Sequence, residues 1–317
     1  NYDGLMDDVS AGNTLVVDNG ALLMNIDVVE ADRILCSVKT PGTMGSRRHI
    51  NLPGVRLNLP ALTEKDHKDL ALAVECEADY IAGSFVRDAA HVRELRDAMK
   101  ALEGDAQIIA KIEDQEAIRN IDSIINESDL IMIARGDLGT EVEFEELPLL
   151  QRRIIKRCHE LGTRVIVATQ LLESMITNPT PTRAEVTDVM NAAYEEADAL
   201  MLSGETSVGA YPVQCIEIMD RIARRVERSG GANYSEGAQM DTLGAKMTKS
   251  AVVMAREVHA AALMVFTRKG SMARIQTWRT AALGVGRSGL RTSTGRSSMA
   301  RSAVAVARSR AGSRSPS

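Results

Sequence analysis

The pattern of apolar and polar positions changes character near residue 60. Before that point, residues 14–20 form an apolar run that ends in an Asn-Gly turn, and residues 21–27 form a second apolar run. Two such runs around an Asn-Gly turn predict a β-hairpin. The breakers Asn51-Leu52-Pro53-Gly54 and Asn58-Leu59-Pro60 come next. The pattern therefore predicts a small β module over residues 1–52, followed by a hinge.

From residue 63 onwards, short apolar runs alternate with helical patterns. Thr63 and Asp66 have the spacing of a capping box, so a helix is expected to begin there. The runs recur about every thirty residues, as repeated βαβ units in a parallel sheet require. No GxGxxG follows the first run, which disfavours a dinucleotide-binding sheet and leaves an open sheet or a barrel. The predicted strands are residues 78–85, 107–112, 130–134, 164–168 and 197–202.

Composition restricts the class of protein and its compartment. Hydrophobic residues make up 44% and charged residues 26% of the chain, which is ordinary for a soluble globular protein. No run approaches the about 18 apolar residues of a membrane span, and the first residues lack the pattern of a signal peptide. The four cysteines form no CxxC pair, which favours free thiols in a reducing compartment. We expect a cytoplasmic protein without a membrane partner.

The two ends of the chain differ in charge. Net charge is −5, yet residues 258–317 contain eleven Lys or Arg and no Asp or Glu. Residues 279–317 consist almost entirely of Arg, Ser, Ala, Gly, Thr and Val, a composition that predicts disorder because it cannot build a core. An RNA-binding tail is the rival interpretation of this segment, but a nucleic-acid partner is not expected.

Polar side chains collect where the predicted strands end. Lys111 and Glu113 lie two residues apart, so they project to the same side of their strand, and the next strand leads to Arg135 and Asp137. Two carboxylates beside a lysine suit Mg²⁺ with open positions and a phosphoryl group in transfer. A salt-bridge network without catalytic function is the alternative. Clustering at carboxyl ends of parallel strands is typical of barrel enzymes.

Two glycines flank the aspartate of the third strand end. Gly136 and Gly139 bracket Asp137, and the pattern predicts that a helix begins in residues 138–146. Glycines before a helix let backbone N–H groups approach a small anion such as a carboxylate. The segment therefore predicts an anion-binding loop beside Asp137.

Several strings together resemble the pyruvate kinase family. The strings occur in the family's order and spacing and extend the resemblance over residues 1–278. They are NLPG at 51–54, SFVR at 84–87, AKIE at 110–113, IMIARGDLG at 131–139, ATQLLESM at 168–175, PTRAE at 181–185 and MLSGET at 201–206. The resemblance implies an α/β fold, a partial (β/α)₈ TIM barrel with an inserted β domain and a truncated C-terminal α/β domain.

The resemblance also implies a domain division and a reaction. Residues 1–52 would be the inserted β-rich domain, 53–229 barrel strands four to eight, 230–278 the start of the C-terminal domain, and 279–317 a tail outside the family pattern. The implied reaction transfers the phosphoryl group of phosphoenolpyruvate to ADP, giving pyruvate and ATP. An aldolase or lyase of similar architecture, and a non-catalytic fragment, are the alternatives.

Matching positions carry the family's residue roles. Lys111 would stabilise the phosphoryl group and the enolate, and Thr169 would lie beside the carbon that is protonated. Glu113 and Asp137 would bind Mg²⁺ or Mn²⁺. Substrate contacts would come from Lys111, Ala134, Gly136, Asp137 and Thr169.

Three positions differ from the family pattern. Arg48 stands where the family has a lysine that faces the nucleotide, and His49 replaces a glycine. Arginine keeps the charge and changes the geometry. Asp114 replaces an asparagine, and an extra carboxylate is expected to raise the pKa values of its neighbours or to tighten metal binding.

The resemblance further implies groups that would precede Asn1. These are the first three barrel strands, a phosphate-binding arginine and the ligands of K⁺. We therefore expect an incomplete enzyme with impaired activity, whose parent protein would be a homotetramer.

Overall fold

The computed structural model describes residues 4–17, 20–45, 50–55, 57–237, 242–258, 260, 262–267 and 302–307. Its chain divides into two compact units, one of residues 1–171 with 199–204 and one of residues 172–198 with 205–317. Each unit is described separately below. The four-domain division expected from the sequence stays a prediction.

The first unit begins with a small antiparallel sheet. Its strands lie in the order β3-β2-β1-β4, and β1 pairs with both β2 and β4. Gly20 has φ +93°, a backbone conformation open to glycine, at the turn between β1 and β2. The predicted hairpin is thus present, although Asn19 of its turn lies outside the described residues. The elements are α1 (Leu5–Asp8), β1 (Thr14–Val17), β2 (Leu22–Val29), β3 (Ile34–Val38) and β4 (Ile50–Asn51).

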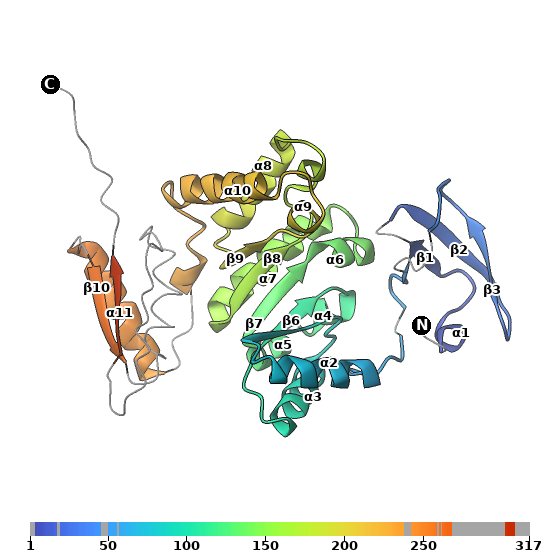
Figure 1. The fold of residues 1–317 in the computed structure, drawn as a ribbon, viewed down its shortest axis with the longest axis horizontal. Coiled ribbons are helices and arrows are strands. Elements are labelled where there is room, and N and C mark those ends of the chain that lie inside the picture. Colours follow the sequence, from blue (N-terminus) through green and yellow to red (C-terminus); the bar gives the residue numbers. More distant parts are fainter. Residues whose placement is uncertain are drawn as a thin grey trace. The chain divides into compact units, whose positions relative to one another are not determined.

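A five-stranded parallel sheet forms the rest of the first unit. Its order β5-β6-β7-β8-β9 follows the chain, and every neighbouring pair is parallel. Figure 1 labels β6 to β9 of this sheet. This is the strand arrangement expected for part of a (β/α)₈ barrel. The strands are β5 (Tyr80–Gly83), β6 (Gln107–Ile112), β7 (Leu130–Ala134), β8 (Arg164–Ala168) and β9 (Ala199–Met201).

Helices connect these strands. The capping box predicted at Thr63 is present, because the Thr63 side chain accepts from the Asp66 N–H and the Asp66 carboxylate accepts from the Thr63 N–H. Asp88 and Asp114 cap two further helices with their carboxylates. The helices are α2 (Glu64–Glu75), α3 (Ala89–Ala101), α4 (Gln115–Arg119), α5 (Ile121–Glu127), α6 (Arg135–Glu141) and α7 (Glu146–Leu161).

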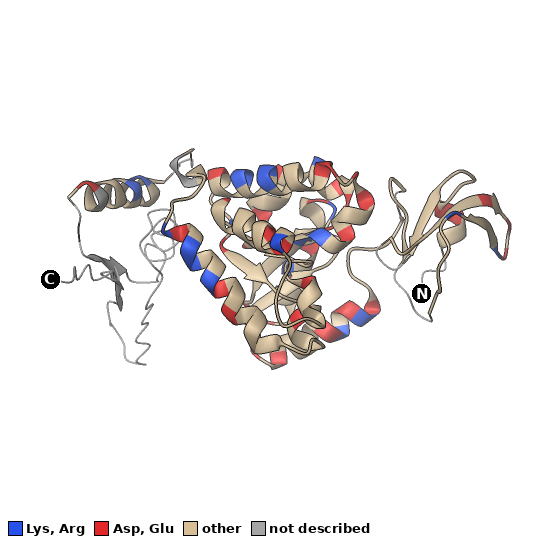
Figure 2. Ribbon diagram, turned by 90° about the horizontal axis from the view of Figure 1, so that it is seen from above, with Lys and Arg blue, Asp and Glu red and all other residues tan. Residues whose placement is uncertain are grey.

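The two faces of the parallel sheet bury different side chains. Successive residues of a strand point to opposite faces, so Ile109 shares a face with Lys111, the site lysine. Ile109 packs with Leu130, Met132 and Ala168 in one apolar cluster. The residues that alternate with these along the strands point to the opposite face of the sheet and are completely buried. They include Ile108, Ile112, Ile131, Ile133 and Val165. Charged residues lie along the helices, while the sheet strands are mostly uncharged (Figure 2).

The second unit contains mainly helices. Helices α8 and α10 pack against one another. A second capping box opens α8, where Thr182 and Glu185 exchange hydrogen bonds, and Glu185 also accepts from the N–H and the hydroxyl of Ser174. The elements are η1 (Glu173–Ile176), α8 (Arg183–Tyr194), α9 (Gly204–Ser207), α10 (Pro212–Glu227), η2 (Tyr234–Gly237), α11 (Leu243–Glu257), β10 (Ala262–Thr267) and β11 (Ser302–Ala307).

Six residues of the basic tail form a strand, although the sequence predicted disorder for residues 279–317. Ser302–Ala307 forms β11, which pairs antiparallel with β10. Alternation of valine with alanine gives this stretch a strand-forming pattern that the Arg- and Ser-rich composition around it obscured. The remainder of residues 279–317 lies outside the described residues.

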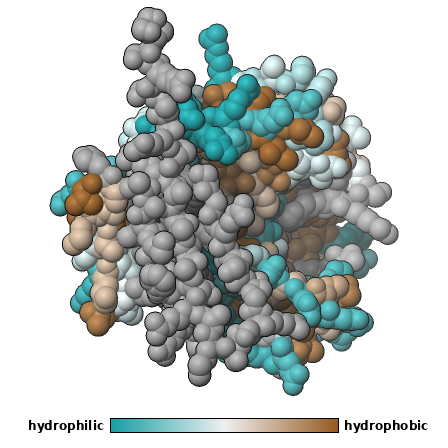
Figure 3. Space-filling view, turned by 60° about the vertical axis from the view of Figure 1, so that its left-hand side comes forward, coloured by the Kyte–Doolittle hydropathy of each residue, from teal (hydrophilic) through white to brown (hydrophobic). Residues whose placement is uncertain are grey.

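Apolar side chains are also present at the surface. Figure 3 shows hydrophobic and hydrophilic side chains interspersed over the described part of one face. Phe144, Val208 and Leu243 are among the exposed apolar residues. Among the described residues, none of the helices combines the length and the apolar character needed to cross a bilayer.

Ile133 provides a test of the core of the parallel sheet. Its side chain is completely buried, so Ile133→Ala should lower the free energy of unfolding by about 2–5 kcal/mol through lost burial and a cavity. Ile216→Ala is the matched control, because Ile216 is 53% exposed and should change stability by no more than about 0.5 kcal/mol. Urea unfolding followed by circular dichroism measures both. Equal losses in the two variants would contradict the buried position of Ile133.

Candidate active site

An ion pair at the carboxyl end of β6 forms the centre of the candidate site. Lys111 is the second-last residue of β6, and Glu113 follows the strand. The Lys111 Nζ lies 2.6 Å from Glu113 Oε1, so both side chains project to the same side as predicted. Lys111 Nζ also donates to Ser84 Oγ at 2.8 Å, at the end of neighbouring β5. Two strand ends therefore fix the position of the ammonium group.

The Glu113 carboxylate is buried. Its side chain is 0% exposed, and Oε2 accepts a hydrogen bond of 2.6 Å from the Phe85 N–H. Burial raises the pKa of Glu113, and the Lys111 ammonium and the Phe85 N–H oppose that rise by favouring the charged form. The other oxygen, Oε1, makes an ion pair with Lys111 but no aligned hydrogen bond. Glu113 Oε1 therefore retains a lone pair that could coordinate a cation.

A second carboxylate, Asp137, acts on Glu113 electrostatically. The Asp137 charge contributes to the raised pKa of Glu113, which places both carboxylates within one electrostatic environment. Carboxylate oxygens are the ligands that Mg²⁺ prefers, and one or two commonly suffice when substrate and water complete the shell. Within the described residues there is no group of three or more His, Cys, Asp or Glu side chains that could bind a metal alone. The carboxylates of Glu113 and Asp137 fit a magnesium ion shared with a substrate.

Thr169 directly follows β8, which lies two strands away from β6 in the sheet. Its hydroxyl accepts from the Gly136 N–H at 2.8 Å and donates to the Ala168 carbonyl at 2.6 Å. Its backbone has φ +71°, the left-handed region that β-branched residues rarely occupy. Such a conformation persists only where the surroundings hold it, and it often marks a functional site. The hydroxyl bridges the ends of β7 and β8.

The guanidinium of Arg135 holds that strained turn. Arg135 is 6% exposed and donates through Nη2 to the Thr169 carbonyl at 2.7 Å and to the Gln170 carbonyl at 3.1 Å. Its Nη1 donates to Gln151 Oε1 at 3.3 Å. The sequence interpretation noted Arg135 as a strand-end residue and missed Gln151. The signal was present, because Gln151 occupies the apolar face of α7 together with Ile154, Ile155 and Cys158.

The two glycines are placed differently from the prediction. Gly136 and Gly139 both lie within α6, because the helix begins at Arg135, directly after β7, rather than near residue 138. The Gly136 N–H is donated to Thr169 in this structure. The prediction of a glycine loop before the helix is therefore wrong, while the proximity of Gly136 to Asp137 and Thr169 is present.

The extra carboxylate Asp114 acts elsewhere than expected. Its Oδ1 accepts from the Ala117 N–H at 2.7 Å and so caps α4. Its charge raises the pKa of Glu141, a residue that the sequence interpretation missed. Burial is the largest cause, followed by Asp114 and then Asp137, and together they raise that pKa to about 7. The proposed nucleotide residue Arg48 lies outside the described residues.

The fold and the site together define a class of protein. Parallel strands joined by helices, with a charged cluster and a strained turn at the carboxyl ends, are the arrangement of α/β-barrel enzymes. The family model "Pyruvate kinase, barrel domain" matches residues 1–216. The chain belongs to the pyruvate kinase family.

Curated relatives extend the match beyond the barrel. Pyruvate kinase isozyme G, chloroplastic, of Ricinus communis is 44% identical over 276 residues, which cover 86% of this chain and 66% of the relative. Pyruvate kinase of Bacillus licheniformis is 47% identical over 231 residues, 72% of this chain and 40% of the relative. Pyruvate kinase of Clostridium acetobutylicum is 39% identical over 280 residues, 86% of this chain and 59% of the relative. The chain spans between two fifths and two thirds of the length of these relatives.

The comparisons correct the expected compartment. A cytoplasmic location was predicted from scattered cysteines and an ordinary composition. The relatives from Ricinus communis, Nicotiana tabacum and Arabidopsis thaliana are named as chloroplastic or plastidial enzymes. The cytoplasmic prediction is therefore wrong, because a reducing compartment with free thiols is not specific to the cytoplasm.

Glu141 gives the site a pH-dependent stability. Its pKa is 4.5 in an unfolded chain and about 7 in the folded metal-free protein, so the folded state binds the proton more tightly. The stability that the protonated form contributes is fully present below pH 4.5 and is lost as pH rises towards 7. Because the carboxyl is only half-buried and partly screened by solvent, the change is of the order of 1–2 kcal/mol.

Glu141→Gln should remove this fall in stability, and urea unfolding in chelator between pH 5 and 8 measures it. The variant should be more stable than the parent chain at pH 8 and nearly equal to it at pH 5. Glu143→Gln is the control, since Glu143 is exposed and carries the same charge. A variant that loses stability with pH as the parent does would contradict the raised pKa.

Proposed function

We propose that this protein transfers the phosphoryl group of phosphoenolpyruvate to ADP, giving pyruvate and ATP. The observation that carries the proposal is the ion pair between Lys111 and Glu113 at the carboxyl end of a parallel strand. Lys111 Nζ lies 2.6 Å from Glu113 Oε1, and the Glu113 carboxylate is buried. Membership of the pyruvate kinase family supports the same reaction. That membership also supports phosphoenolpyruvate and ADP as the proposed substrates.

Lys111 is proposed to neutralise the phosphoryl group and the enolate oxygen. The Lys111 side chain is 24% exposed, so its ammonium is anchored by Ser84 and Glu113 while the side chain is still open to a ligand. Phosphoryl transfer depends mainly on positioning and on electrostatic stabilisation of developing negative charge. A lysine fixed in this way meets both requirements without moving.

Glu113 and Asp137 are proposed to hold Mg²⁺, or Mn²⁺ in its place. When bound, the ion would supply positive charge at the phosphoryl and enolate oxygens. Glu113 itself keeps one oxygen fixed by the Phe85 N–H and presents the other towards Lys111. Ala134, Gly136 and Asp137 are proposed to bind the substrate carboxylate through backbone at the start of α6.

Thr169 is proposed to orient the proton that completes pyruvate. Its hydroxyl is held between the Gly136 N–H and the Ala168 carbonyl, so the proton position is defined rather than free to rotate. To pass its proton to the enolate carbon, the Thr169 hydroxyl would turn away from the Ala168 carbonyl, and it would then recover a proton from water. Arg135 acts on the reaction indirectly, since it holds the backbone of Thr169.

The remaining partners are proposed on the family resemblance alone. Arg48 would face the nucleotide, K⁺ would be a second cation, and the protein would assemble as a homotetramer. The names of the plant relatives support a plastid as the compartment. An aldolase or lyase reaction has no observation in its favour, because the family match concerns pyruvate kinase.

Lys111→Met tests the reaction in the chain 1–317. Removing the ammonium should lower ATP formation from phosphoenolpyruvate and ADP by about a thousandfold, because transition-state charge would lose its partner. The assay couples released pyruvate to NADH oxidation and measures ATP independently with luciferase. Turnover of the parent chain is expected to be below that of the Bacillus licheniformis relative under the same conditions.

Lys100→Met is the matched control, because Lys100 is exposed at the end of α3 and should leave turnover within twofold of the parent. Release of pyruvate without ATP would indicate a lyase or phosphatase reaction and would contradict the proposal. So would ATP formation that Lys111→Met leaves unchanged, or no ATP formation by the parent chain.

A further inference from the structure

A short turn after β5 touches the candidate site from one end. Ser84 accepts from Lys111 Nζ at 2.8 Å, and the Phe85 N–H donates to Glu113 at 2.6 Å. Phe85 has φ +50°, a left-handed backbone that points its N–H towards the buried carboxylate. Two consecutive residues of this turn therefore position both members of the ion pair.

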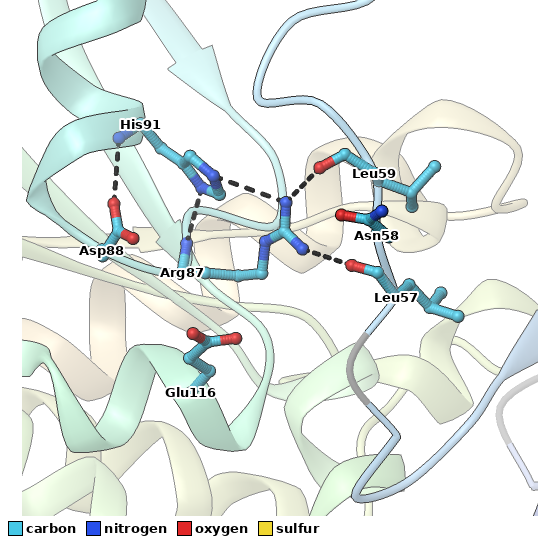
Figure 4. Close-up of a pocket in the computed structure, with 7 residues that line it drawn as sticks. All are labelled: Leu57, Asn58, Leu59, Arg87, Asp88, His91 and Glu116. Carbon is cyan, nitrogen blue, oxygen red and sulfur yellow. Dashed lines mark hydrogen bonds between the residues drawn. The ribbon is translucent and has the colours of Figure 1, made fainter. Parts of the chain in front are cut away.

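The other end of the same turn binds the segment that joins the two sheets. Residues 57–59, which we call the hinge segment, lie between β4 and α2 and include neither helix nor strand. Arg87 donates through Nη1 to the Leu57 carbonyl at 2.6 Å and through Nη2 to the Leu59 carbonyl (Figure 4). One planar guanidinium thus spans two carbonyl groups of the hinge segment.

The backbone of Arg87 is anchored on both sides. The Arg87 N–H donates to His91 Nδ1 at 3.2 Å, and the Arg87 carbonyl accepts from Asn120 Nδ2 at 2.9 Å. His91 Nε2 lies 3.4 Å from Arg87 Nη2, and a neutral imidazole has a single acceptor, so the backbone bond is the better one. Arg87, His91 and the hinge segment line one pocket, which Figure 4 shows.

The hinge segment has one further anchor on the side of the β module. The Asn58 N–H, between the two clasped carbonyls, donates to Asp8 Oδ2 at 2.7 Å. Asp8 belongs to α1 and precedes the strands of the small sheet. The hinge segment is therefore held by the parallel-sheet side through Arg87 and by the β module through Asp8.

We propose that Arg87 is a positioning residue for nucleotide binding, which acts by fixing the hinge segment to the turn that also positions Lys111 and Glu113. It does not touch substrate, because its guanidinium is already committed to two hinge carbonyls. The inference rests on the proposed function, in which the β module contributes the nucleotide-facing Arg48. The clasp sets where the β module begins relative to the phosphoryl-transfer groups.

The chemistry of the clasp makes arginine specific. Carbonyls two residues apart require two diverging N–H donors held in one plane, which the guanidinium supplies and an ammonium does not. Lysine could satisfy one carbonyl, and methionine could fill part of the volume without satisfying either. Arg87→Lys and Arg87→Met therefore form a graded series.

Two measurements on the chain 1–317 test the proposal, and only one depends on turnover. Hydrogen exchange should show the Asn58 amide, the hinge-segment N–H that donates to Asp8, exchanging about tenfold faster in Arg87→Met and by an intermediate amount in Arg87→Lys. Steady-state assays should show the KM for ADP rising about tenfold in Arg87→Met, with the KM for phosphoenolpyruvate within twofold of the parent. Arg93→Met is the control on α3, the helix that follows Arg87, where the exposed Arg93 side chain pairs with Glu127.

The two measurements separate failure of the clasp from failure of the proposed function. A parent chain that forms no ATP would contradict the proposed function, while the exchange measurement would still report on the clasp. Hinge-segment exchange equal to that of Arg93→Met would overturn the clasp. Two results would overturn the positioning role. One is a fall in the kcat of Arg87→Met with an unchanged KM for ADP, and the other is an equal fall in melting temperature in Arg87→Met and Arg87→Lys.

Discussion

The burial of the Glu113 carboxylate is the constraint on which the site depends. A charged side chain that is 0% exposed is costly unless it is paired and hydrogen-bonded, and here Lys111 supplies the charge and Phe85 the N–H. Both partners come from the ends of neighbouring strands, so the pairing of β5 with β6 places them beside Glu113. Oε1 lies against the Lys111 ammonium, and its remaining lone pair could coordinate a divalent ion. Stability of the sheet and capacity for metal binding are therefore linked at one residue.

A second constraint acts at the adjoining strand ends. Thr169 and Gln170 both have positive φ, and the buried Arg135 donates to the carbonyls of both. Gln151 of α7 accepts a hydrogen bond from Arg135. The helix between β7 and β8 therefore helps to stabilise the strained turn after β8. Together with the turn after β5, this gives a site in which backbone groups, rather than flexible side chains, set most positions. Such rigidity suits a reaction controlled by electrostatic positioning.

Much of the fold was predictable because the apolar pattern was strong. The bounds of β6, β7 and β8 equal their predictions, and both Lys111 and Glu113 project as alternation requires. Gln151 and Glu141 were missed because their importance comes from neighbours distant in sequence. The start of α6 was misplaced because glycines weaken a helical pattern, whereas tertiary contacts stabilise the helix from Arg135. The resemblance, not periodicity, supplied the chemical identity of the substrates.

The most direct measurement is Mn²⁺ binding to the chain 1–317, followed by electron paramagnetic resonance of the free ion. One Mn²⁺ site is expected in the parent chain and at least a tenfold weaker one in Glu113→Gln, since a hard cation loses a charged oxygen ligand. Glu116→Gln, three residues further along the chain, should bind Mn²⁺ as the parent does. Equal binding by the parent and Glu113→Gln would contradict the central claim, because the buried carboxylate would then be only the partner of Lys111.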